Sequence, residues 1–361
     1  MIKLFDPYFD KSEKKAIDEV FESGVWASGA GRGKVLEFEN EFNRYIGSKQ
    51  CVALNSGTAA LHLALMLMDI KNKEVLVPSM TFVSTVHAVL YAGAKPVFVD
   101  IDEDTLCLNV DDLKKKISKR SSLIIPVHFG GIPCDLAEIR RIARQYEIAV
   151  VEDAAHACGS QFAGKKIGSH SEIVCFSFHP VKNLAMPTGG AITLNGRFAE
   201  KKKNLLNSLR WCGIDNRKGV CYDVSRLGWN YYMNEFSAAI GLQQLKKIDK
   251  MNSRRKAIAR MYHKGILFEH KTPILDDSCY HLYWIRVKNR SEFIKFMNDS
   301  GIEIGIHYRP VHLMSAYKSS CSLPITESVW PELVSIPMHI NLTNSQIKYI
   351  IEKINEFHNK I

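Results

Sequence analysis

The chain has 361 residues, enough for one large or two medium domains, and its 46% hydrophobic and 24% charged residues are typical of a soluble globular protein. No apolar run is long enough to cross a bilayer, the first residues lack the layout of a signal peptide, and the nine cysteines show neither paired nor metal-ligand spacing. These features argue against a membrane or disulfide-rich protein, and we expect a cytoplasmic protein without a metal site.

The net charge of +10 raises the question of a nucleic-acid partner. The basic residues are spread along helical stretches such as 201–203 and 246–247, and no recognition motif accompanies them. We therefore expect a solvated basic surface and no nucleic-acid partner, although a positive field would also attract an anionic small substrate.

The first part of the chain predicts a layered α/β domain. Helices are expected at 12–23, starting at Ser12, and at 35–46; the glycine-rich residues 28–34 lack the spacing of a phosphate loop and predict a flexible turn. Short apolar strands then alternate with helices. The expected strands are 51–54, 74–78, 96–100, 122–128, 148–152, 173–178 and 191–194. The expected helices between them are 58–68, 82–91, 110–117 and 136–146. This alternation predicts a mostly parallel sheet of seven strands with helices on both faces.

The last part of the chain has a different texture. After residue 198 the sequence reads as helical and polar to about residue 265. Strands at 281–287 and 302–308 then alternate with helices at 291–299 and 344–358. We expect a large domain at 1–250 and a small α+β domain at 251–361.

Candidate binding residues follow the strands, because ligands of open α/β sheets gather at the carboxyl ends of the strands. Ser56, Gly57 and Thr58 would offer hydroxyls and a close backbone at a helix N-terminus, which favours a phosphate or simply caps the helix. Phe82 could cover the face of a ring or belong to the core. Asp153 ends an apolar strand, where it could pair with a protonated pyridine nitrogen or cap a helix. His156 could lie beside the oxygen of that ring or be structural.

Lys182 follows the strand 173–178, which Pro180 ends, and Ser177 and Asn183 flank it. Alone it could be a surface lysine, but a desolvated amine at this place would have a lowered pKa and could form a Schiff base with a carbonyl. Together the strand ends offer a phosphate site, a ring stack, a pyridinium partner and a Schiff-base lysine. The combination predicts pyridoxal 5'-phosphate as the cofactor.

Six motifs of the sequence resemble the DegT/StrS family of pyridoxal-phosphate-dependent nucleotide-sugar aminotransferases, which have the aspartate-aminotransferase fold (fold type I). They are Ser56-Gly57-Thr58-Ala59-Ala60-Leu61, Pro78-Ser79-Met80-Thr81-Phe82, Glu152-Asp153-Ala154-Ala155-His156-Ala157, Ser177-Phe178-His179-Pro180-Val181-Lys182-Asn183, Gly228-Trp229-Asn230-Tyr231 and His307-Tyr308-Arg309-Pro310-Val311-His312.

The resemblance implies a role for each candidate. Lys182 would bind the cofactor covalently, Asp153 would pair with its ring nitrogen, Phe82 would stack on the ring and His156 would lie beside it. The phosphate would be held by Ser56, Gly57, Thr58 and Ser177. Asn230 would reach the phosphate site of the partner subunit in a homodimer with shared active sites. The substrates would face His307, Arg309 and His312.

Two positions depart from the family pattern. Thr188 stands where an acidic residue is common, so the sugar contact near the lysine would differ, and Tyr232 stands where an arginine is common at the dimer interface.

The resemblance implies transfer of an amino group from glutamate to a keto-sugar nucleotide. A 4-keto-6-deoxy sugar is expected, in the biosynthesis of an amino sugar for a surface polysaccharide such as O-antigen, or for another glycosylated product. A 3-keto-sugar aminotransferase and a pyridoxal-phosphate-dependent sugar dehydratase are alternatives, but the dehydratases carry histidine in place of the lysine. A cofactor-binding regulator without turnover would not need both Lys182 and Asp153.

Overall fold

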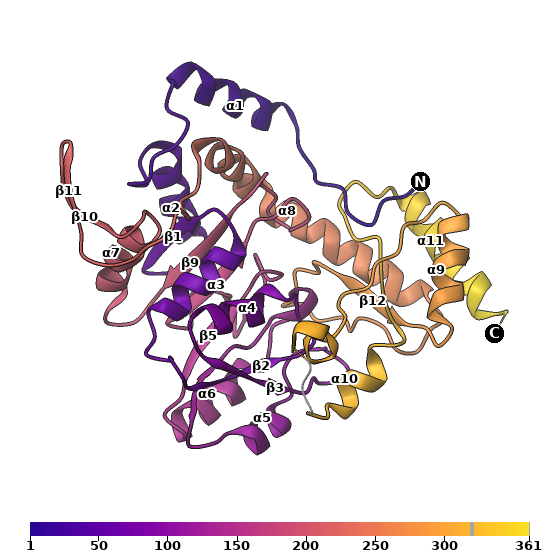
Figure 1. Ribbon diagram of the computed structural model, residues 1–361. Coiled ribbons are helices and arrows are strands. Elements are labelled where there is room, and N and C mark those ends of the chain that lie inside the picture. Colours follow the sequence, from indigo (N-terminus) through magenta and orange to yellow (C-terminus); the bar gives the residue numbers. More distant parts are fainter. Residues whose placement is uncertain (318–320, 361) are drawn as a thin grey trace.

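The central feature of the computed structural model, which describes residues 1–317 and 321–360, is a seven-stranded sheet in the order β1-β9-β8-β5-β4-β2-β3 (Figure 1). Its strands are β1 Gln50–Leu54, β2 Glu74–Pro78, β3 Lys95–Val99, β4 Ser121–Ile124, β5 Ala149–Asp153, β8 Ile173–Ser177 and β9 Gly190–Leu194. Only β9 runs antiparallel to its neighbours β1 and β8; the other pairs are parallel. The predicted mostly parallel sheet is confirmed.

Helices cover both faces of this sheet, which explains why its strands are almost wholly apolar. One face packs against α2 Gly33–Ile46, α5 Val110–Lys116, α6 Leu136–Gln145 and the first half of α8 Glu235–Gly265. The other face packs against α3 Gly57–Met66, α4 Ser84–Tyr91 and α7 Ala199–Leu209. Among the described residues, none of the helices has the combination of length and apolar character that spanning a membrane requires.

Three ion pairs fix the helices α1 and α2 to this body. Helix α1 Lys11–Ser23 is capped by Asp10 and not by the expected Ser12, because the Asp10 carboxylate accepts the Ser12 N–H while Glu13 reaches back in a capping box. Both acids pair with Lys247 of α8. On α2, Glu39 pairs with Arg210; these side chains are 3% and 1% exposed, and both also hydrogen-bond the backbone of Ala53.

A third cluster of buried apolar side chains lies in the C-terminal part of the chain. It is formed by the second half of α8, the antiparallel strands β12 Tyr283–Arg286 and β13 Leu333–Ile336, and the helices α9 Arg290–Asp299 and α11 Asn344–His358. The short helix α10 Pro324–Val329 and two 3-10 turns, η2 Val311–Leu313 and η3 Ser315–Tyr317, lie between these elements in the chain. The expected boundary near residue 250 falls inside α8, and the two-domain division stays a prediction.

Three expectations about secondary structure were wrong, two for predicted strands and one for a predicted helical stretch. Residues 302–308 form no strand, because Ile302 and Gly305 make only single bridges, and β13 pairs with β12 instead. The strand expected at 122–128 ends at Ile124, since Pro126 has no N–H to donate. The stretch expected to be helical contains the exposed hairpin β10 Ile214–Lys218 and β11 Cys221–Val224, which projects from the body in Figure 1. A smaller hairpin, β6 Gln161–Phe162 with β7 Lys165–Lys166, and a 3-10 turn η1 Phe129–Gly131 were also not foreseen.

Candidate active site

A cavity of about 370 Å³ lies at the carboxyl ends of β1, β2, β5 and β8. These strand ends contribute Ser56, Thr81, Asp153 and Ser177, and the cavity also reaches segments from both ends of the chain. Of the twelve residues that the sequence suggested, nine line the cavity: Ser56, Gly57, Thr58, Phe82, Asp153, His156, Ser177, Lys182 and His307. The structure therefore brings most of the candidates together, whereas their individual roles remain to be tested.

The N-terminus of α3 forms one end of the cavity. The Ser56 hydroxyl caps this helix by accepting the Ala59 N–H at 3.1 Å. Position 57 requires glycine, because a Cβ there would lie 2.7 Å from the Cβ of Ser177. In the part of the chain that the structure describes, the N–H groups of Gly57 and Thr58 donate to no protein acceptor. Free N–H groups at a helix N-terminus suit a phosphate.

Asp153 lies at the end of β5, where its side chain is buried in the cavity wall. Burial raises the pKa of its carboxyl group, and this effect is opposed by hydrogen bonds from the Ala155 N–H at 3.0 Å and the Thr85 hydroxyl at 2.8 Å and by the charge of Lys182. A buried carboxylate held in this way can pair with a protonated ring nitrogen. Thr85 was not foreseen, although it follows Phe82 by one helical turn.

The neighbouring Glu152 lies in a separate buried network. It faces His128 at 3.2 Å and Arg140 at 3.3 Å and accepts a hydrogen bond from the Ser171 hydroxyl. Burial alone would raise the pKa of Glu152, but these partners outweigh it and lower the pKa. Because β5 carries both acids, this network fixes the strand end that presents Asp153.

Lys182 lies in the turn after β8, with its amine in the cavity wall and 3.5 Å from His281 Nε2. Burial lowers the pKa of this amine to about 8, although the carboxylate of Asp153 acts in the opposite direction. The turn is fixed by Asn183, whose amide donates to Asn252 at 2.8 Å and to the Cys279 carbonyl at 2.9 Å. The expected desolvated lysine is therefore present, and His281 is a neighbour that sequence reading missed.

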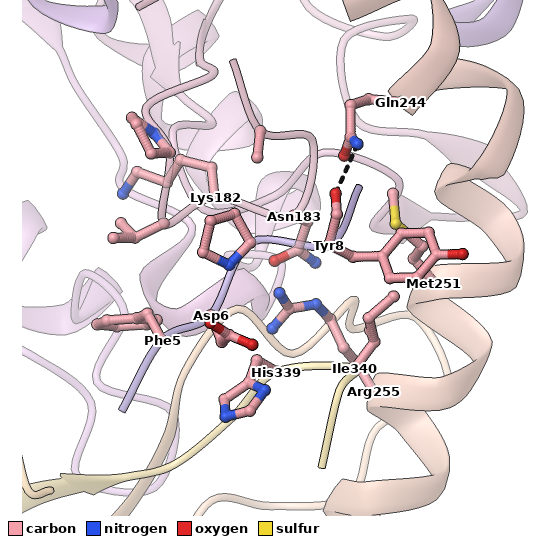
Figure 2. A pocket seen from close by; sticks show the side chains of 14 residues that line it. Phe5, Asp6, Tyr8, Lys182, Asn183, Gln244, Met251, Arg255, His339 and Ile340 are labelled. Carbon is pink, nitrogen blue, oxygen red and sulfur yellow. Dashed lines mark hydrogen bonds between the residues drawn. The ribbon is translucent and has the colours of Figure 1, made fainter. Parts of the chain in front are cut away.

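The N-terminal segment braces the other side of this turn, as Figure 2 shows. Residues 5–8 pass between the Lys182 turn and α8, where Gln244 donates to the Tyr8 carbonyl at 2.8 Å. A small cavity of about 10 Å³ remains there, with Arg255 and His339 in its wall. This size is that of a single water site. Phe5 lines this small cavity and the large one.

The far wall of the large cavity contains His156, His307 and Tyr308. The ring centroids of His156 and Tyr308 lie 6.0 Å apart, and the angle between the two ring planes is 23°. The ring centroids of Tyr308 and Phe82 are 5.8 Å apart. Burial lowers the pKa of His156 well below its usual range and that of His307 to about 4, so both imidazoles are neutral at pH 7. Tyr308 was not among the predicted residues, although it lies inside the quoted motif.

Three predicted residues do not line the cavity. Arg309 is exposed and donates to the Leu313 carbonyl at 2.9 Å. His312 turns away, with Nδ1 2.6 Å from the Ser79 hydroxyl. Neither residue lines the cavity, and the expectation that they face the substrates stays a prediction. Asn230 is exposed and does not line the cavity of its own chain, although its carbonyl accepts a hydrogen bond at 3.3 Å from Asn55, the residue before Ser56. Its predicted place in a partner subunit stays a prediction.

The described residues contain no group of three or more His, Cys, Asp or Glu side chains placed to hold a metal ion. Their cysteines form no disulfide, and six of the nine are buried.

Comparison with known proteins gives a consistent result. The model of the DegT/DnrJ/EryC1/StrS aminotransferase family matches residues 7–355. The uncharacterised protein MJ1066 of Methanocaldococcus jannaschii is 35% identical to this chain, over 98% of this chain and 96% of that protein. Among solved structures, Streptococcus pneumoniae Spr1654 in its PMP form superposes with a TM-score of 0.94 at 28% identity, with both chains fully covered. Helicobacter pylori PseC, an aminotransferase involved in the biosynthesis of pseudoaminic acid, gives a TM-score of 0.94 at 25% identity, also over the whole of both chains.

Proposed function

The chain belongs to the DegT/DnrJ/EryC1/StrS aminotransferase family, and on this premise we propose that it transfers the amino group of glutamate to a keto-sugar nucleotide with the help of pyridoxal 5'-phosphate. Enzymes of this family are pyridoxal-phosphate-dependent transaminases that act on sugars. The observation that carries the proposal is that the Lys182 amine and the Asp153 carboxylate line the same cavity. One end of this cavity is formed by the N-terminus of α3, where N–H groups lack protein acceptors.

The residues of the cavity fit this cofactor. The phosphate would be held by the N–H groups of Gly57 and Thr58 and by the hydroxyls of Ser56 and Ser177. Asp153 would pair with the ring nitrogen, and Phe82, whose side chain is 54% exposed beside the cavity, would cover the ring. When bound, the cofactor supplies an electron sink for the negative charge left when the substrate carbon loses its proton.

Lys182 and Asp153 would divide the proton chemistry between them. With a pKa of about 8, about one tenth of the Lys182 amine is unprotonated at pH 7, and this fraction can accept a proton from the substrate carbon and return it. Asp153 holds a proton on the ring nitrogen by its negative charge. The neutral histidines nearby leave Asp153 as the charged partner of Lys182 in this wall.

The acceptor sugar is proposed from the motif His179-Pro180-Val181-Lys182, which resembles the 4-keto branch of the family more than the 3-keto branch. Thr188, which replaces the usual acidic residue, lines the cavity and donates its hydroxyl hydrogen to the Asn55 carbonyl. A carboxylate at this place would repel that carbonyl, so the sugar contact here differs in kind. The product would be an amino sugar nucleotide for a surface polysaccharide or another glycosylated product.

We propose a homodimer in which Asn230 completes the phosphate site of the partner subunit. The support is that Asn230 is exposed and that the adjacent hairpin and loop expose large apolar side chains that suit an interface: Val220, Tyr222, Val224 and Leu227.

The test combines cofactor trapping with product analysis. The purified protein is reduced with borohydride, and the peptide that carries the cofactor is identified by mass spectrometry; it should contain Lys182 and be missing from Lys182→Ala. The protein is then incubated with glutamate and a panel of 4-keto and 3-keto sugar nucleotides. Trapped cofactor without any aminated sugar would reject the proposed substrate class, whereas cofactor fixed to another lysine would reject the assigned site.

A further inference from the structure

The wall of the small cavity behind the Lys182 turn contains three buried polar atoms that have no partner among the described residues. They are Asn183 Oδ1, Arg255 Nε and His339 Nδ1, and their residues are only 5–6% exposed. Figure 2 shows the three side chains pointing toward one another, from the turn, from α8 and from the segment after β13. Because a buried polar atom without a partner costs free energy, three such atoms around one cavity indicate a partner that they share.

The orientation of the Asn183 amide follows from its hydrogen bonds. Its nitrogen donates to Asn252 Oδ1 at 2.8 Å and to the Cys279 carbonyl at 2.9 Å. The orientation of Asn252 is fixed in turn, because its own nitrogen donates to the Cys158 carbonyl at 3.0 Å. The atom that Asn183 presents to the small cavity is therefore its oxygen, which can only accept.

His339 presents a second acceptor. Its Nε2 lies 3.1 Å from the Lys3 carbonyl, which can only accept, so Nε2 carries a proton. Burial lowers the pKa of His339 in spite of the opposing charge of Asp6, so the ring is neutral at pH 7 and Nδ1 carries no proton. Arg255 presents a donor: its Nη1 donates to the Met338 carbonyl at 2.6 Å, and its Nε–H is left over.

One donor and two acceptors around a space for a single small molecule match the chemistry of water. The cavity of about 10 Å³ has the size of one water site, and buried waters make about three hydrogen bonds. A halide ion would suit the Arg255 guanidinium, but it would face the lone pairs of Asn183 Oδ1 and His339 Nδ1. An ammonium ion would suit the two acceptors, but it would face the charge of the guanidinium.

We propose that a single buried water molecule links these side chains by accepting from Arg255 Nε–H and donating to Asn183 Oδ1 and His339 Nδ1. Through this water, Arg255 acts as a positioning residue for the turn that carries Lys182. The water site joins three segments that are far apart in the sequence, and residues 5–8 cover it. The inference goes beyond the proposed function, because it concerns the apoprotein and holds whatever the large cavity binds.

The first test is a crystal structure of the unaltered apoprotein, grown with sodium bromide as the only halide salt. We expect an electron-density peak within hydrogen-bond distance of Asn183 Oδ1, Arg255 Nε and His339 Nδ1, without anomalous scattering from bromine. An anomalous peak at this place would show that the site binds a halide. A site without any peak would show that the three atoms find other partners. Either of these two results overturns the inference.

The second test compares Arg255→Gln with Arg255→Met. Both variants remove the charge and the bond to the Met338 carbonyl, but only glutamine keeps an N–H at the place of Nε. The readout is the pKa of Lys182 in the apoprotein, measured from the pH dependence of its acylation by mass spectrometry. The pKa should stay at about 8 in Arg255→Gln and rise toward 10.5 in Arg255→Met, because a loosened turn exposes the amine to solvent.

The matched control is Arg260→Met, which removes an exposed arginine from the same helix and should leave the pKa of Lys182 unchanged. An equal rise in both Arg255 variants would show that the charge or the Met338 bond fixes the turn, and no rise in Arg255→Met would show that Arg255 does not position it. Each result overturns the positioning role. If Arg255→Met does not fold, the crystal structure of the unaltered protein still decides whether the water is there. Both tests use the apoprotein, so failure of the proposed function would leave their outcome unchanged.

Discussion

Replacing Lys182 by methionine should stabilise the apoprotein, because the fold holds a lysine amine where its charge is poorly solvated. The pKa of Lys182 falls from 10.5 to about 8 on folding. Between these two values the unfolded chain binds more protons than the folded chain, so the free energy of unfolding rises with pH in this window. Below pH 8 the amine is protonated in both states, and the full destabilisation of the folded protein by its buried charge is present. A shift of about 2.5 units at about 1.36 kcal/mol per unit gives about 3 kcal/mol at pH 7, which is an upper value because part of the side chain faces the open cavity.

The expected gain can be measured as a melting temperature. At about 2.1 cal/mol/K per residue near 60 °C, the unfolding entropy of this chain makes 3 kcal/mol equivalent to about 4 °C. Lys182→Met should therefore melt up to about 4 °C higher than the unaltered apoprotein at pH 7. At pH 10 the remaining difference should be about 1 kcal/mol, or little more than 1 °C, because the folded amine is then neutral and pH 10 is only about half a unit below the pKa of the unfolded lysine.

Two controls separate charge from shape. Lys182→Arg keeps a cation at the position and should give no gain in melting temperature. Replacement of the exposed Lys218 by methionine should change stability by less than about 0.5 kcal/mol at either pH. A Lys182→Met variant that melts at or below the unaltered protein at pH 7, or whose gain is the same at pH 7 and pH 10, would refute the reasoning.

Three further outcomes are expected. Glu39→Gln should lower the free energy of unfolding by about 3–5 kcal/mol in thermal denaturation, because it leaves a buried arginine without its carboxylate, whereas Glu41→Gln, in an exposed pair, should cost less than about 1 kcal/mol. Asp153→Asn should slow amino transfer by orders of magnitude in a steady-state assay, since one charged partner shifts a pKa by about 1–3 units; a rate near that of the unaltered enzyme would contradict its role. Asn230→Ala and Lys182→Ala should complement each other when mixed under proven subunit exchange, because a mixed dimer with shared sites contains one intact site; activity that stays at the level of the separate variants would reject sharing.

The parallel sheet was predictable because strands covered on both faces are continuous apolar runs that alternate with helices. The hairpin 214–224 was not, since its strands are exposed and lack an alternating pattern. A strand was wrongly predicted at residues 302–308 because Ile302, Ile304 and Ile306 alternate with other residues as they would in a strand. Whether such a run finds a strand partner depends on distant residues.

The residues of the candidate site also fall into a group that could be predicted from the sequence and a group that could not. Ser56, Phe82, Asp153 and Lys182 could be grouped because each follows a strand of one sheet, and the carboxyl ends of parallel strands meet at one edge. Other neighbours of Lys182, among them Phe5, His281 and Tyr308, come from the two ends of the chain. Their approach depends on how the C-terminal cluster and the N-terminal segment pack, and no local pattern encodes that packing.

Helix α8 has a consequence for how the protein unfolds. Its 31 residues begin in the core beneath the sheet and end in the C-terminal cluster, so the same element belongs to both. Melting either cluster would expose one half of this helix, and a helix loses cooperative support when half of it is released. The two cores are therefore coupled energetically through one continuous rod, which favours a single all-or-none transition over stepwise loss of the C-terminal part. The geometry of the active site, which draws on both, is then retained or lost as a whole.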